Sequence, residues 1–139
     1  MKDLKYLFAY TVPLATLISF NSFGIGTYTA VFYAFVVLPV LDVVLGKSSN
    51  NLTESKREEK KLNKIFDWML YINLPIVYIL MVYGFNKVSS IDYTITEKIG
   101  LYLSGGILLA TNGINVAHEL CHRRKYYEKF IGKALFLPC

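Results

Sequence analysis

The chain has 139 residues, 54% of them hydrophobic, and a formal net charge of +5. A basic chain of this kind could bind nucleic acid, but its Lys and Arg residues lie in short groups between long apolar segments. This arrangement excludes nucleic acid as a partner and excludes a soluble domain built around one large core. It indicates an integral membrane protein.

Four apolar windows follow one another along the chain, at residues 4–23, 25–45, 65–85 and 99–117. Each is close to the roughly 20 residues with which an α-helix crosses a lipid bilayer. We therefore predict an all-α integral membrane protein, a helical bundle with four transmembrane helices in residues 1–139, belonging to one domain. No small-residue cleavage site follows the first window, so we expect that helix to be retained.

The first two windows are separated only by a short segment that contains Gly24 and Gly26, which predicts a tight helical hairpin. Near the end of the second window stand Pro39 and Asp42. The Asp42 carboxylate can be hydrated or paired at the membrane interface, or it can point into the bundle. We favour the interface because a charge costs less near a helix end than at the centre of the bilayer.

The basic residues define the topology. Of the 15 Lys and Arg residues, all but Lys87 and Lys98 fall on one side when the windows alternate across the bilayer. The positive-inside rule then places both ends of the chain, and the charged loop over residues 47–64, in the cytoplasm. Residues 87–98 are expected to form a short loop on the outer side.

The third window begins with Asp67 and Trp68, and its tyrosines suit the aromatic belts at the membrane surfaces. The role of Asp67 does not follow from the sequence. The fourth window contains the triplet Ser104, Gly105 and Gly106, whose small side chains favour close helix packing in lipid.

The fourth window continues into residues 112–124, NGINVAHELCHRR, which contain both histidines of the chain. His118 and His122 are four residues apart and therefore lie on one face of a helix, where both imidazoles can bind a metal. With Thr111 and Asn115 they form a polar stripe. Because polar groups facing lipid are costly, this stripe should face a protein interior or a site.

The segment from His118 to His122 allows three interpretations. The histidines can be interfacial residues, with Glu119 paired to Arg123 on the next turn. The segment also fits the H-E-x-x-H pattern of zinc proteases, with Glu119 as general base and a third ligand from elsewhere, which would make the protein an intramembrane zinc metalloprotease. Finally, imidazole suits iron as well as zinc, so the segment can be one histidine box of an iron oxygenase.

The pattern N-x-x-H-E-L-x-H-[RK], read here from Asn115 to Arg123, resembles the first histidine box of the membrane alkane 1-monooxygenases. These belong with the fatty acid desaturase-like, histidine-rich di-iron proteins. A second segment, with Pro39, Asp42 and Gly46, resembles the P-x-x-D-x-x-x-G segment at the end of that family's second helix. Helix order, basic inner loop and cytoplasmic box agree with the family over essentially the whole chain.

The resemblance implies a six-helix bundle in the bacterial inner membrane that holds two non-haem iron ions. It implies that O₂ and electrons from rubredoxin are used to hydroxylate the terminal carbon of n-alkanes to 1-alkanols. His118 and His122 are then metal ligands, while Asn115 and Glu119 are candidates for orienting them. A desaturase or a different hydroxylase of the same superfamily is the alternative within this resemblance.

The later histidine boxes of that family do not occur in residues 1–139. Two imidazoles cannot hold two iron ions, so we expect the chain to be the N-terminal part of a longer protein and to be inactive by itself. The range of alkane chain lengths does not follow from these residues.

Overall fold

The computed structural model of the chain describes residues 8, 10–45 and 64–139, which are helical or form short turns and contain no strand. The predicted loop over residues 47–64 lies outside the described residues except for Lys64, and so does Gly46. The described elements are α1 (Thr11–Phe20), the 3₁₀ turn η2 (Gly24–Tyr28), α2 (Thr29–Phe32), the π-helix η3 (Tyr33–Val37), α3 (Leu38–Leu45), α5 (Lys64–Tyr71), α6 (Asn73–Ser90), α7 (Ile95–Leu108), the π-helix η4 (Leu109–Ile114), α8 (Asn115–Cys121) and α9 (Tyr126–Phe136).

Three continuous helical stretches of the described chain are long and apolar enough to cross a membrane: Gly24–Val44, Asp67–Ser90 and Ile95–Cys121. They correspond to the second, third and fourth predicted windows, and with the helical fold they confirm the predicted all-α membrane class. In the first window, α1 has 10 residues, which is only about 15 Å of helix. Part of that window lies outside the described residues, so a span over residues 4–23 stays a prediction.

The predicted outer loop over residues 87–98 is too long. Helix α6 continues to Ser90, and α7 already begins at Ile95. Lys87 lies in the last turn of α6, where a positive side chain interacts favourably with the helix dipole. Thr94 and Glu97 form a capping box that starts α7, because each side chain accepts a hydrogen bond from the other residue's backbone N–H. Only a short turn joins the two helices.

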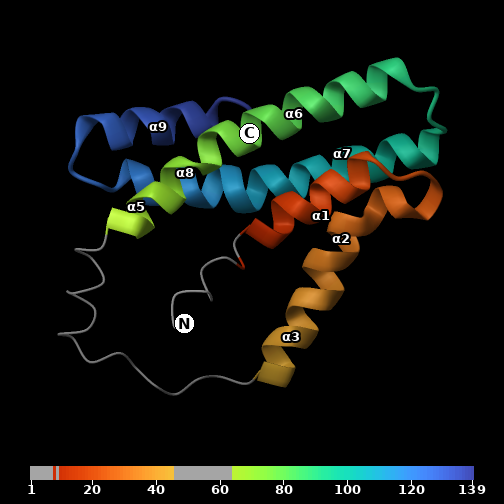
Figure 1. Cartoon of the computed structure of the whole chain (residues 1–139), viewed down its shortest axis with the longest axis horizontal. Helices are drawn as coiled ribbons and strands as arrows, with labels where there is room; N and C mark the ends of the chain where they lie inside the picture. Colours follow the sequence, from red (N-terminus) through yellow and green to blue (C-terminus); the bar gives the residue numbers. More distant parts are fainter. Residues whose placement is uncertain (1–7, 9, 46–63) are drawn as a thin grey trace.

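The turn after α1 and the turn between α6 and α7 lie together at one end of the molecule (Figure 1). The Gly24 backbone N–H donates a hydrogen bond to Oε1 of Glu97 at 2.6 Å, and Gly24 has a positive φ of 57° that favours glycine. The ring centroids of Phe23 and Tyr93 are 5.4 Å apart. Ala30 N–H donates to Ser19 Oγ at 2.9 Å, which closes the predicted hairpin between α1 and α2.

The stretch α2–η3–α3 leaves the other helices at an angle, as Figure 1 shows. Asp42 lies on α3 with an exposed side chain. It therefore does not point into the described part of the bundle, in line with the favoured interpretation.

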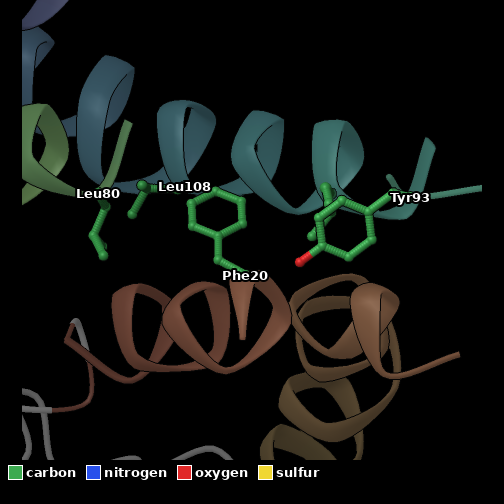
Figure 2. Close-up of a cluster of buried hydrophobic side chains, with 5 residues drawn as sticks. Phe20, Leu80, Tyr93 and Leu108 are labelled. Atoms are coloured by element: carbon green, nitrogen blue, oxygen red, sulfur yellow. The ribbon is translucent and has the colours of Figure 1, made fainter. Parts of the chain in front are cut away.

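Two buried clusters hold the described helices together. In the first, Phe20 of α1 points toward α7 between Leu80, Leu108 and Tyr93 (Figure 2). Ser104 and Gly105 are buried at this junction, as the small-residue triplet predicts, and Ser104 Oγ donates to the Thr27 carbonyl at 2.8 Å. The second cluster joins α6, α8 and α9 and consists of Val77, Ala117, Leu120 and Leu135.

Candidate metal centre

One continuous helix, formed by α7, η4 and α8, contains His118 and ends at Cys121, directly before His122. Its middle part, η4, is a π-helix that ends at Ile114, immediately before α8. Such π-segments widen a helix locally and occur often at functional sites. The helix ends at Cys121, and His122 is its C-cap, whose N–H donates to the His118 carbonyl at 3.2 Å. The helix therefore continues from the fourth window through His118, as the sequence predicts, and the bounds of the fourth membrane span stay a prediction.

His118 and His122 both have exposed side chains. The His118 ring lies edge-on against Phe136 of α9, with 5.0 Å between the ring centroids. The spacing of four residues places His118 and His122 on one face, so that both imidazoles can bind the same metal ion or two neighbouring ions. Imidazole is a ligand for iron as well as for zinc. Among the described residues, no group of three His, Cys, Asp or Glu side chains stands close enough to hold a metal ion. The two imidazoles can supply only part of a metal centre.

The polar stripe lies on a face of the helix that the described residues leave largely open. Asn115 is exposed like the two histidines, while Thr111 is half-buried and donates to the Ile107 carbonyl at 2.8 Å. Glu119 is also exposed. In a lipid environment, exposed polar groups of this kind favour cover by further protein. That the stripe faces a protein interior stays a prediction.

Arg123, the residue after His122, makes contacts that the sequence interpretation did not find. Its guanidinium pairs with Asp67 of α5 and lies 3.3 Å from Oε1 of Glu128 on α9. The pair with Glu119 on the preceding turn, which belonged to the interpretation of the histidines as interfacial residues, is present with 3.7 Å between Nε of Arg123 and Oε1 of Glu119, and the Glu119 side chain is 61% exposed. In the sequence, the feature that could have indicated this ion pair was the acidic residue Asp67 at the start of an apolar window.

Glu128 is a buried carboxylate, with a side chain that is only 3% exposed. Besides Arg123 it accepts a hydrogen bond from the Tyr71 hydroxyl at 2.5 Å. Burial by itself would lower the pKa of Arg123, but the hydrogen bonds and charges of Asp67 and Glu128 outweigh it and raise that pKa. The guanidinium is therefore charged, and the four groups form one hydrogen-bonded cluster that we call the Arg123 cluster: Asp67, Tyr71, Arg123 and Glu128.

A second buried polar contact joins α6 to the π-segment. Nδ2 of Asn112 donates to Oδ1 of Asn73 at 2.8 Å, and Nδ2 of Asn73 donates to the Met69 carbonyl at 2.8 Å. Side-chain hydrogen bonds between helices fix their register in lipid. The site-bearing helix is thus tied to α6 just before α8 begins.

Comparison with known proteins gives three related sequences. Alkane 1-monooxygenase 2 of Alcanivorax borkumensis is 32% identical over 143 aligned positions, which cover 97% of this chain and 37% of that protein. Alkane 1-monooxygenase of Pseudomonas putida is 29% identical over 110 positions, covering 78% of this chain and 26% of the relative. The chain is similar to alkane 1-monooxygenases.

Alkane 1-monooxygenase 1 of Alcanivorax borkumensis is a third relative, 27% identical over 70% of this chain and 24% of its own length. No protein-family model matches the chain. The chain spans between about a quarter and somewhat more than a third of the length of these relatives.

Proposed function

We propose that this chain is the N-terminal part of a membrane-bound non-haem di-iron monooxygenase that hydroxylates the terminal carbon of n-alkanes to 1-alkanols. The observation that carries the proposal is the position of His118 and His122, on one face at the end of a spanning helix, in a chain that is similar over 97% of its length to an alkane 1-monooxygenase. The complete protein would lie in the bacterial inner membrane and receive its electrons from rubredoxin.

In this proposal His118 and His122 each provide a neutral imidazole nitrogen to iron. No group of three His, Cys, Asp or Glu side chains that could hold a metal ion occurs among the described residues, so further ligands would have to come from outside them. Two non-haem iron ions would supply the activation of O₂ that protein side chains cannot perform. The chain's own contribution is to hold two ligands in fixed positions, and Phe136 supports this by packing edge-on against the His118 ring.

The location at the helix end suits the substrates. An alkane dissolves in the hydrocarbon of the bilayer and can approach the helices from there. Trp68, beside the Arg123 partner Asp67, and Tyr126, three residues after Arg123, are both exposed, as expected for an aromatic belt at the membrane surface. A site at this level meets hydrocarbon on one side and cytoplasmic water, protons and an electron donor on the other. The oxidant must be kept from water until the C–H bond is positioned, so the open face of the histidines would have to be covered in the complete protein.

The test is metal analysis and product formation in the complete protein. Purified wild type should contain iron and convert octane to 1-octanol when it is supplied with O₂ and reduced rubredoxin. His118→Ala and His122→Ala should each lose iron and abolish 1-octanol formation, but they should still insert into the membrane, because the apolar windows drive insertion.

The exposed Tyr126→Phe variant is the matched control, since it changes a polar aromatic residue near the same helix end without removing an imidazole. It should retain iron and activity. About one zinc per chain without iron, as expected for a mononuclear zinc protease, would reject the di-iron proposal. Normal hydroxylation by His118→Ala would reject the ligand assignment.

A further inference from the structure

Arg123 lies in the short connection between α8 and α9, one residue after His122 (Figure 1). Its N–H donates to the Leu120 carbonyl at 3.2 Å, so its backbone is still attached to the last turn of the histidine helix. A change in the position of the Arg123 side chain therefore affects the last helical turn, which carries His118 and His122.

The Arg123 side chain reaches two other helices. Asp67 lies near the start of α5, and Glu128 lies in the first turn of α9. Both carboxylates contact the same guanidinium nitrogen, Nη1, which therefore lies between α5 and α9. The Arg123 side chain is thus held against two helices at once.

The contacts are shielded from water. The side chains of Arg123, Asp67 and Glu128 are 26%, 23% and 3% exposed. Pairs with this degree of burial are screened less than surface pairs, and loss of the Arg123 charge would leave the buried Glu128 carboxylate without its positive partner. The remaining pair, with the exposed Glu119, contributes little by comparison.

We propose that Arg123 is a positioning residue for the metal centre: its contacts with Asp67 and Glu128 fix the rotation of the helix end that carries His118 and His122. The part of this proposal that concerns metal rests on the proposed function. Asp67 and Glu128 are the two fixed points, and their hydrogen bonds and ion pairs in the described part of the chain are with Arg123 and Tyr71. Without either contact, the end of the helix can rotate about its axis. The two imidazoles then adopt a wider range of orientations.

The experiment compares two variants of the complete protein with a control at the opposite end of the same helix. Asp67→Asn removes one of the two carboxylate charges, and Arg123→Lys removes the guanidinium nitrogen Nη1 that contacts both carboxylates. Glu97→Gln removes a carboxylate that also ties this helix to another element, through Gly24, but far from the histidines. Fe²⁺ affinity is measured by competition with a chelator, backbone hydrogen exchange by mass spectrometry over residues 116–124, and thermal unfolding on the metal-free protein.

Asp67→Asn and Arg123→Lys should weaken Fe²⁺ binding by about 10–100-fold, as for other changes that disorient metal ligands. Glu97→Gln should leave Fe²⁺ affinity within about twofold even if it lowers the unfolding temperature, because the site is distant. Hydrogen exchange over residues 116–124 of the metal-free protein should accelerate in the first two variants and not in the control.

The proposal is overturned if Asp67→Asn and Arg123→Lys lower the unfolding temperature but leave exchange over residues 116–124 at the wild-type rate. Equal Fe²⁺ affinity in all variants would also overturn it. If wild type binds no Fe²⁺ at all, the proposed function fails. The exchange measurement then still decides, without metal, whether Arg123 fixes the helix end.

Discussion

Glu119 is the residue at which the two metal chemistries of a His–Glu–x–x–His segment differ most. In a zinc protease this carboxylate would be the general base and would be indispensable for turnover. In the structure its side chain is 61% exposed, and its Oε1 lies 3.7 Å from Nε of Arg123. In the proposed oxygenase, Glu119 is one of two candidates for orienting the metal ligands, and Asn115 is the other.

We expect Glu119→Gln in the complete protein to retain measurable hydroxylation. Loss of an orienting hydrogen bond typically lowers metal affinity or activity by about 10–100-fold, whereas loss of a general base removes nearly all chemistry. Iron content and 1-octanol formation are measured together, with His122→Ala as the inactive reference. A Glu119→Gln protein with full iron and no product would contradict the assigned role.

At the scale of elements, the close packing of α8 against α9 determines what surrounds the histidines. Gly132 is buried in α9, and a Cβ atom there would lie 2.8 Å from Cys121 Sγ and 2.9 Å from the Ala117 carbonyl oxygen. Because one of these neighbours is backbone, the helices would have to move apart to accommodate it. The same hairpin brings Phe136 against the His118 ring.

Gly132→Ala is therefore expected to destabilise the protein by about 1–3 kcal/mol, the usual cost of overpacking. It should also lower the iron content, because Phe136 would no longer support His118. Gly106→Ala is the matched control, since a Cβ atom at Gly106 meets nothing within 4 Å. Thermal unfolding in detergent and iron analysis of both variants check this prediction, which fails if the two variants behave alike.

For the whole molecule, the structure separates two ends of the helical bundle. The turns at Gly24 and Tyr93 lie together at one end, while Asp67 and Arg123 meet at the other. This agrees with the alternation of the windows across the bilayer. The orientation, with Arg123 on the cytoplasmic side, rests on the distribution of Lys and Arg and stays a prediction.

Labelling of single cysteines with a membrane-impermeant maleimide tests the orientation. In a protein with Cys121→Ser and Cys139→Ser, Ser89→Cys should be labelled in spheroplasts, because Ser89 is exposed near the outer turn. Lys125→Cys, beside the helix end at Arg123, should be labelled only after lysis. The reverse pattern would invert the topology and place the histidines on the outer side.

The sequence by itself determined the features that depend on neighbours along the chain. The membrane class and the second, third and fourth spans follow from the length and hydropathy of apolar windows, which the described helices match. The shared face of His118 and His122 follows from helical periodicity. The start of α7 was less accurate, since the capping box of Thr94 and Glu97 begins the helix inside the segment that was expected to form a loop.

Only the tertiary structure decided which distant residues meet. Asp67 and Arg123 are 56 positions apart, and their pairing requires α5 and the end of α8 to lie at the same level. The return of α9 along α8, which buries Glu128 beside Arg123, likewise depends on a turn and on close glycine packing. Hydropathy indicates which segments lie within the lipid bilayer, but it does not indicate which helices are neighbours there. That choice follows from side-chain packing across the bundle.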